Sequence, residues 1–416
     1  MLVRHLSLTD YRNYASAEVS LRPGANLFVG SNGQGKTNLV EALGYLSTLG
    51  SHRVSGDRAL IRSTEQSAII RARLENDGRE LLVEVQLNRE GANRAQVNRS
   101  VVKIREIPRY FSSVLFAPED LALVRGDPSG RRRFLDQLLV ARIPRLAGVQ
   151  ADYERVLKQR NTLLKSARAS GVRGTQLSTL DIWDERLVAL GSEIIVDRDA
   201  LVARLRPHVE AAYLAVAGAD HSPRLSLRLS ILGATGDDDD SAPVDAAVSA
   251  TIASPYERVE VEQAFRAALA RVRRQELDRG ITLCGPHRDD ILFELNALPA
   301  KGYASHGESW SFALGLKLAS ADLLRSDSAT GDPVVILDDV FAELDAARRR
   351  RLAASVADYE QVLITSAVFD DVPEQLTAHT VRISAGTILD EVPEVPEVPE
   401  VPEVPEVPEG DGSHHG

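Results

Sequence analysis

Short alternating runs of apolar and polar residues fill the first 120 positions, a pattern typical of β-strands. Residues 2–22 predict a hairpin around a polar turn at 11–14. The runs 68–74 and 80–87 predict a second hairpin, because Asn76-Asp77-Gly78 between them favours a tight turn. The other elements predicted here are strands at 26–29, 96–102 and 114–116, and a helix from position 36 to about Leu49.

From position 128 the apolar residues are spaced as in helices. Two long helices are predicted over 129–169 and 180–218, with a break at 171–175. Such a pair predicts an antiparallel helical arm. The arm is short, because a helix of about 38 residues spans only about 57 Å. A strand at 224–231, a polar loop with the acidic run 237–240, and a helix at 256–277 follow.

The last third predicts α/β structure, because strand-like and helical runs alternate. The predicted strands are 281–283, 290–295, 334–337 and 361–364, and the helices are 308–324 and the segment after Asp345. The folded body is predicted to end near Leu389. Beyond it Glu-Val-Pro occurs six times between Glu391 and Pro408. Proline at every third position excludes helices and sheet ladders, so an extended, disordered tail is predicted over 390–416.

Composition narrows the class of protein. The chain has 416 residues, of which 44% are hydrophobic and 26% charged, as in ordinary soluble proteins with more than one domain. No apolar stretch approaches the length of a membrane span, and the first residues lack the apolar core of a secretion signal. The single cysteine, Cys284, excludes an internal disulfide and fits a reducing, cytoplasmic location.

The net charge of −11 does not exclude a nucleic-acid partner. The predicted tail holds nine of the 60 acidic residues and no Lys or Arg, so 51 acidic residues nearly balance the 49 basic ones elsewhere. Most of these basic residues are Arg, whose planar guanidinium suits bidentate contacts to phosphate.

The most specific motif is a phosphate loop between the predicted strand at 26–29 and the helix after it. Strand, glycine-rich turn and helix together point backbone N–H groups and a helix N-terminus at a polyphosphate. We therefore expect a bound nucleoside triphosphate, with Lys36 on its β- and γ-phosphates and the Thr37 hydroxyl on Mg²⁺. The loop matches G-x-x-x-x-G-K-[ST] at every fixed position and consists of Gly30, Ser31, Asn32, Gly33, Gln34, Gly35, Lys36 and Thr37.

A pair of carboxylates completes the predicted site. Four apolar residues at 334–337 read as a buried strand that ends in Asp338 and Asp339. Asp338 would reach Mg²⁺, and Asp339 would act as the catalytic group that polarises the attacking water. Two solvated acids at a strand end are the alternative. Asp338 lies 302 positions after Lys36 with the helical arm between them, so one ATPase head would be assembled from N- and C-terminal lobes.

This arrangement resembles the ABC-type ATPases of the chromosome-maintenance and repair group. The resemblance implies an α/β, SMC-like P-loop ATPase head with a short helical arm inserted, and ATP and Mg²⁺ as cofactors. The implied domains are an N-terminal ATPase lobe at 1–125, a mainly helical arm at 126–278, a C-terminal ATPase lobe at 279–389 and the tail at 390–416.

The resemblance also assigns roles in the C-terminal lobe. Ser305, Gly307 and Glu308 resemble the signature motif that caps the ATP of a second protomer, Asp345 stands in the D-loop, and Thr365 stands at the switch position. Glu308 is a departure, because the signature often has Gln there and an ionised carboxylate cannot donate a hydrogen bond. Thr365 is a second departure, because transporter-type ATPases use His there.

Within this group the sequence resembles the RecF family of bacterial recombination mediators over residues 1–389. The family implies an ATP-dependent homodimer that clamps on gapped DNA at single-strand/double-strand junctions, without sequence specificity. It also implies slow, DNA-stimulated ATP hydrolysis and joint action with other mediators to load a recombinase in recombinational repair, replication restart and SOS induction. The segments that carry the resemblance are LTDYRNY at 8–14, FAPEDL at 116–121, VRGDP at 124–128, RRRFLD at 131–136 and GPHRDD at 285–290.

Basic clusters on predicted helices are candidates for contacts with DNA. Arginines can bind phosphates without reading the sequence, and no aromatic platform for base stacking is visible. Solvated helix faces with internal ion pairs are the alternative for each cluster. The candidates are Arg131, Arg132, Arg133, Arg271, Arg273 and Arg274.

Two other functions are compatible with these motifs. One is an SMC-like DNA-processing ATPase with a nuclease partner, although its relatives carry much longer arms. The other is a nucleotide-dependent DNA scaffold that does not hydrolyse ATP, since Asp339 and Glu308 are not the residues most favourable to turnover. A transporter ATPase is disfavoured, because no membrane partner segment is present.

Overall fold

The structure is a computed structural model that describes residues 1–76, 78–170, 178–233, 256–328 and 331–389. The predicted tail at 390–416, the acidic run at 237–240 and the predicted break at 171–175 lie outside the described residues. In these ranges no helix combines the length and the apolar character that a membrane crossing needs.

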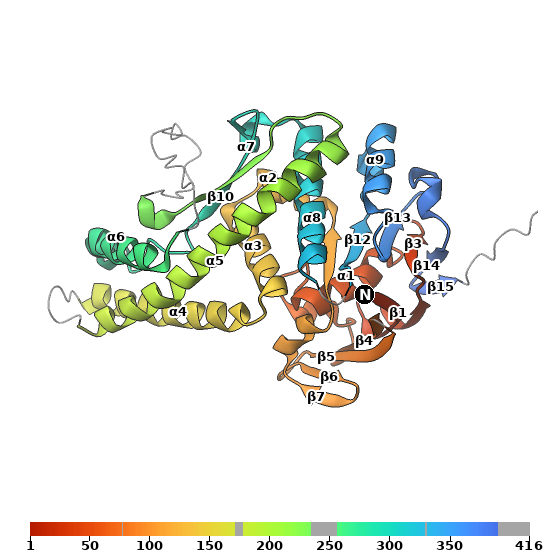
Figure 1. Cartoon of the computed structure of the whole chain (residues 1–416). Coiled ribbons are helices and arrows are strands. Elements are labelled where there is room, and N and C mark those ends of the chain that lie inside the picture. The colour runs from red at the N-terminus through yellow and green to blue at the C-terminus, as the bar shows by residue number, and fades with distance from the viewer. Residues whose placement is uncertain (77, 171–177, 234–255, 329–330, 390–416) are drawn as a thin grey trace, which may run out of the picture.

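The central sheet joins strands from both ends of the described chain (Figure 1). Its order is β15-β14-β3-β13-β12-β8, with every pair parallel except β14 and β15. All residues of β12 and β13 are buried, because both faces of a parallel sheet are covered, and the runs Val334–Leu337 and Val362–Ile364 are therefore apolar. The prediction of one ATPase head made from N- and C-terminal lobes is confirmed. The strands are β3 (Gly24–Val29), β8 (Ser113–Phe116), β12 (Val334–Asp338), β13 (Gln361–Ser366), β14 (Thr380–Ser384) and β15 (Thr387–Leu389).

A second, antiparallel sheet covers the helix that follows the phosphate loop. Its order is β2-β1-β4-β5-β6-β7, and both predicted hairpins are confirmed. Helix α1 (Lys36–Thr48) buries Leu39 and Leu43 in the core that this sheet shares with β3 and β12. The start of α1 is therefore held between two sheets. The strands are β1 (Leu2–Tyr11), β2 (Tyr14–Ser20), β4 (Ser67–Asn76), β5 (Arg79–Asn88), β6 (Arg94–Val97) and β7 (Ser100–Val102).

The predicted strand at 96–102 is wrong in one respect, because it is split into the hairpin β6–β7. The turn residues Asn98 and Arg99 have φ angles of 50° and 67°. Two successive residues with positive φ match the tight turn that fits the twist of a hairpin. The predicted strand at 281–283 is absent, and that at 224–231 ends at Arg228.

The other face of the central sheet is covered by α8 (His306–Asp327), which is buried along most of its length. Phe312 and Leu316 of α8 share one core with Leu337 of β12 and Leu205 of α5 (Ser178–Ala217). Smaller elements on this side are α2 (Leu121–Arg125), α7 (Ala300–Tyr303), α9 (Ala346–Val356), and a three-stranded sheet of β9 (Arg224–Arg228), β10 (Asp290–Leu295) and β11 (Leu298–Pro299).

The helical arm extends to one side of the head, on the left of Figure 1. It contains α4 (Leu146–Ser170), the first half of α5 and α6 (Arg258–Arg279), with a core of its own around Leu187, Ile194 and Phe265. Helix α5 continues from this core into that of the head, where Leu205 and Val209 are buried. One long helix therefore contributes to the cores of both the arm and the ATPase head.

The single helix predicted over 129–169 is wrong. The structure has two helices, α3 (Pro128–Arg142) and α4, separated at Ile143. Ile143 has φ −130° and ψ 81°, outside the helical region. The cause is visible in the sequence, because Pro144 disfavours a helical conformation at the residue before it.

Candidate nucleotide-binding site

The predicted phosphate loop joins β3 to α1 and requires its glycines. Gly33 and Gly35 have φ angles of 81° and 115°. A Cβ atom on Gly35 would lie 2.6 Å from the Tyr14 hydroxyl, and one on Gly30 would lie 2.2 Å from the carbonyl oxygen of Ile383. Any side chain at these two positions would therefore collide with its surroundings and displace the loop.

Neighbouring turns hold the loop in place. The carbonyl oxygen of Gln34 accepts hydrogen bonds from Gly386 N at 3.1 Å and from Asn13 Nδ2 at 3.2 Å. Lys36 is buried, and its Nζ donates to the carbonyl oxygen of Ser31 at 3.3 Å, so the ammonium group folds back over the loop. No side chain of the described residues caps α1 at Gly35. The first N–H groups of α1 and its dipole therefore suit a phosphate group.

The structure brings three predicted site residues into one hydrogen-bonded group. Thr37 Oγ1 donates to Asp338 Oδ1 at 3.0 Å, and Thr365 Oγ1 donates to the same oxygen at 2.6 Å. The Thr365 hydroxyl also accepts from Asp339 N at 2.9 Å. Asp339 has a φ of 51°, a backbone conformation that is uncommon for residues other than glycine and that occurs preferentially at functional sites.

The electrostatics of this group favour a bound cation. Burial raises the pKa of Asp338 to about 6, against the hydrogen bonds from Thr365 and Thr37, and the charges of Asp339 and Glu119 raise it further. Mg²⁺ is commonly held by one or two protein oxygens together with phosphates and water. Within the described residues, no group of three or more His, Cys, Asp or Glu side chains could hold a metal by itself. Thr37 and Asp338 thus fit the few protein ligands that Mg²⁺ needs beside a nucleotide.

Two features of the site were missed from the sequence. Arg12 forms a bidentate pair with Glu41 of α1, at 2.8 and 2.6 Å, and Glu41 is fully buried. The sequence does contain a sign of this pair, because Glu41 is the single carboxylate within the otherwise apolar run 39–43. His52 lies with its Nε2 at 3.9 Å from Asp338 Oδ2, and burial lowers the pKa of this imidazole. His52 could not be found, because nothing local connects it to a strand 286 positions later.

The predicted signature residues begin α8. Ser305 is the N-cap: its Oγ accepts from Glu308 N at 3.2 Å, and Glu308 Oε2 accepts from Ser305 N at 2.8 Å. These bonds from Ser305 hold the pKa of Glu308 below its usual range. A Cβ atom on Gly307 would lie 2.9 Å from Arg348 Nη1. Among the described residues, no hydrogen bond links Ser305 or Glu308 to the phosphate loop of the same chain.

The predicted D-loop residue, Asp345, caps α9. Its Oδ1 accepts from Arg348 N at 2.9 Å, and its Oδ2 accepts from Arg348 Nη1 at 3.1 Å. The side chain remains exposed, with 56% of its surface accessible. Asp345 is thus free to meet another molecule while it stabilises α9.

The arginine candidates divide into buried and exposed side chains. Arg131 is buried and bonds Asp290 at 2.7 and 3.0 Å, which excludes it from a DNA-binding surface. Arg273 is half-buried and forms ion pairs with Asp181 and Asp184. Arg132 is half-buried, whereas the remaining three candidates, Arg133, Arg271 and Arg274, are exposed.

Comparisons with known proteins agree with this geometry. Residues 2–385 match the family described as RecF/RecN/SMC N terminal domain. The "DNA replication and repair protein RecF" of Clavibacter sepedonicus is 68% identical over 391 residues, which cover 94% of this chain and 95% of the relative. The protein of that name from Streptomyces avermitilis is 53% identical, covering 93% and 99%.

Solved structures give the same result. The structure titled "Structure of the recombination mediator protein RecF-ATP in RecFOR pathway" superimposes with a TM-score of 0.80 at 26% identity. The match covers 94% of this chain and 97% of that chain. A second structure, titled for RecF-ATPrS in the same pathway, matches equally well, with a TM-score of 0.80.

Proposed function

Since the chain belongs to the RecF family of DNA replication and repair proteins, we propose that it is an ATP-dependent recombination mediator that acts on DNA. The observation that carries the proposal is the hydrogen-bonded group of Thr37, Asp338 and Thr365 beside the phosphate loop. This group joins the two lobes at the point where a nucleotide would lie.

The residues of the site have distinct tasks in this proposal. Backbone N–H groups of the loop and Lys36 bind the phosphates of ATP. Thr37 and Asp338 would hold Mg²⁺, which supplies neutralisation of the phosphate charge when it is bound. Asp339 orients the attacking water, and Thr365 fixes both carboxylate residues through its single hydroxyl.

The site is completed by a second copy of the chain. Ser305, Gly307 and Glu308 lie at the N-terminus of α8, where helix N–H groups suit a phosphate. Among the described residues, neither Ser305 nor Glu308 forms a hydrogen bond with the phosphate loop of its own chain. ATP would therefore join two protomers, with the exposed Asp345 between them. The dimer would clamp on DNA at single-strand/double-strand junctions and help other mediators load a recombinase, in replication restart and SOS induction as well as in repair. Hydrolysis of ATP would open the dimer and release the DNA.

Sedimentation tests the ATP-dependent dimer. The wild-type chain is expected to be dimeric with ATP and monomeric with ADP, and the Lys36→Met variant to stay monomeric with ATP. The reason is that the variant lacks the ammonium group that binds the β- and γ-phosphates. A dimer that forms equally in all three samples would overturn the ATP-clamp mechanism.

Glu308→Gln tests the signature contact separately from folding. Glutamine preserves the capping box with Ser305, so the free energy of unfolding should change by less than about 0.5 kcal/mol. Its amide can donate to the opposing nucleotide, and it removes a negative charge that faces phosphate. The ATP-dependent dimer should therefore become several-fold tighter by sedimentation. Ser305→Ala is the comparison, because it removes the cap at about 1 kcal/mol and should weaken the dimer. Equal dimer affinity in both variants would contradict the trans contact.

A further inference from the structure

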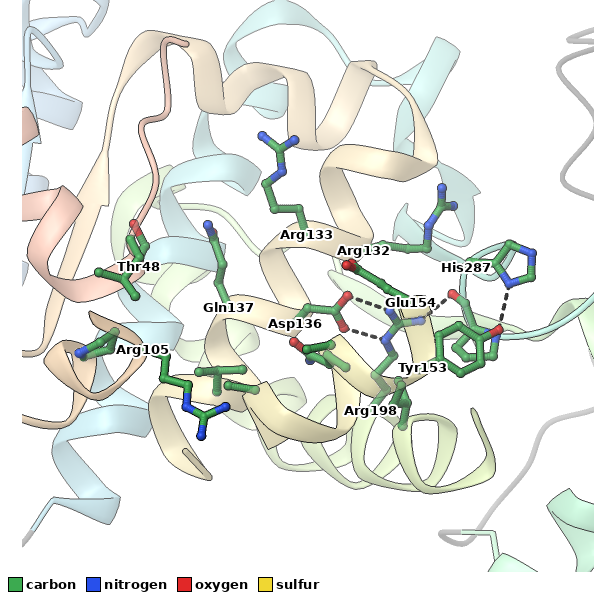
Figure 2. Close-up of a pocket in the computed structure, with 18 of the residues that line it drawn as sticks. Thr48, Arg105, Arg132, Arg133, Asp136, Gln137, Tyr153, Glu154, Arg198 and His287 are labelled. Atoms are coloured by element: carbon green, nitrogen blue, oxygen red, sulfur yellow. Dashed lines mark hydrogen bonds and ion pairs between the residues drawn. The ribbon is translucent and has the colours of Figure 1, made fainter. Parts of the chain in front are cut away.

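A groove of about 600 Å³ lies where the helical arm meets the N-terminal lobe (Figure 2). Its lining includes none of the residues of the nucleotide site. One wall is the C-terminal end of α1 with the short helix η2 (Ile104–Arg109), and the other is formed by α3 and α4. We call it the arginine groove, after Arg105, Arg132 and Arg133, which line it.

The charge of the arginine groove is not balanced. Asp136 is neutralised by a bidentate pair with Arg198, at 2.8 and 2.7 Å, which leaves Glu154 as the remaining acid of the lining. Within the described part of the chain, neither Arg105 nor Arg133 forms an ion pair, and both are exposed. Arg132 donates to the carbonyl oxygen of Asp289, at 2.8 Å. Burial and the nearby Arg198 lower the pKa of Arg132, so an anion in the groove would relieve an electrostatic cost.

The polar lining indicates which anion. Arg105 and Arg133 come from opposite walls, so a ligand that contacts both must carry more than one negative group. Arginine forks suit phosphate oxygens, and the uncharged donors Thr48 and Gln137 are typical of contacts to a sugar–phosphate backbone.

The same lining argues against recognition of single-stranded bases. The aromatic side chain of the groove, Tyr153, is buried, and its hydroxyl is bonded to His287 Nδ1 at 2.8 Å (Figure 2). It is therefore unavailable as a platform on which unpaired bases stack.

We propose that the arginine groove binds the phosphate backbone of double-stranded DNA. The inference rests on the proposed function, because it assumes that the chain acts on DNA, and it adds the surface that makes the contact. Arg105 of the N-terminal lobe and Arg133 of α3 bind successive phosphates of one DNA backbone. Arg132 forms the floor of the groove between them. Binding would thus brace the arm against the ATPase lobe.

The test is the double variant Arg105→Ala/Arg133→Ala, which spares Arg132 because that side chain also holds the loop at Asp289. Binding to a labelled 30-base-pair duplex is measured over a series of salt concentrations. We expect affinity at least about tenfold weaker, and a slope of log K against log salt smaller by roughly 2, since each lost phosphate contact removes about 0.9. Arg105→Lys/Arg133→Lys should recover most of the affinity, because it keeps both charges.

Arg79→Ala is the matched control, because Arg79 is an exposed arginine at the β4–β5 turn outside the groove. It should leave the affinity and the slope unchanged. Unchanged duplex binding by the double variant would overturn the proposal. So would a double variant that no longer binds polyglutamate, a polyanion without phosphate, but still binds DNA. A wild-type chain that binds no DNA would instead contradict the proposed function itself.

Discussion

Replacing Asp338 with asparagine is expected to slow single-turnover hydrolysis of ATP by at least about 100-fold, because a metal ligand of this kind contributes several kcal/mol. The amide oxygen can still accept the hydrogen bonds from Thr37 and Thr365, now at 3.0 and 2.6 Å. The geometry of the loop is therefore retained, and the change removes the negative charge that would hold Mg²⁺. ATP affinity, which rests mainly on the loop and Lys36, should change much less.

Two Thr365 variants test whether the position of Asp338 and Asp339, rather than the charge of Asp338, matters for hydrolysis. Thr365→Ser keeps the hydroxyl that bonds Asp338 and Asp339 N and should hydrolyse ATP at nearly the wild-type rate. Thr365→Val keeps the shape and loses both bonds, so its rate should fall clearly. Wild-type hydrolysis by Asp338→Asn would contradict the metal-binding role. A wild-type chain without turnover, with or without gapped DNA, would favour the non-hydrolysing scaffold.

The nucleotide site could be predicted because its chemistry lies in two short, contiguous motifs. Gly30–Thr37 and the strand before Asp338 each define their local structure. Parallel strands bring their carboxyl ends to one edge of the sheet, so Thr37 and Asp338 meet although 301 positions separate them. Thr365, which the family resemblance assigned to the switch position, lies at the end of β13, between β3 and β12.

The arginine groove could not be predicted from the sequence, because a run of arginines does not reveal which of their side chains face the core. Arg131 turns inward on α3 and pairs with Asp290, a residue 159 positions later that only the fold brings near. Arg133, two positions along the same helix, faces solvent. The arginine groove also needs Arg105, which stands alone in the sequence. In the groove, Arg105 from another lobe thus takes the place of Arg131 beside Arg132 and Arg133.

The largest effect on stability is expected from a substitution in the helical arm. Arg160 of α4 is fully buried; its Nη2 donates to Glu276 of α6 at 2.6 Å and its Nε to Asp184 of α5 at 2.7 Å. Arg160→Met keeps the length of the side chain and removes its charge. Because Glu276 would remain buried without its cation, the variant should lose about 3–5 kcal/mol of unfolding free energy in the arm.

Urea unfolding followed by fluorescence can assign this loss to the arm. The chain has two tryptophans, Trp183 next to Asp184 on α5 and Trp310 on α8 of the head. In a Trp310→Phe background, the Trp183 transition should move to lower urea in Arg160→Met.

The controls separate a buried pair from an exposed one. Arg266→Met breaks solvent-exposed pairs with Glu185 and Glu262 and should cost less than about 1 kcal/mol. Arg160→Met/Glu276→Leu removes the stranded charge and should recover part of the loss, since apolar replacements of buried pairs are often neutral. If Arg160→Met costs no more than Arg266→Met, ionic contacts do not hold the arm together. Its stability would then come from the apolar core around Leu187 and Phe265.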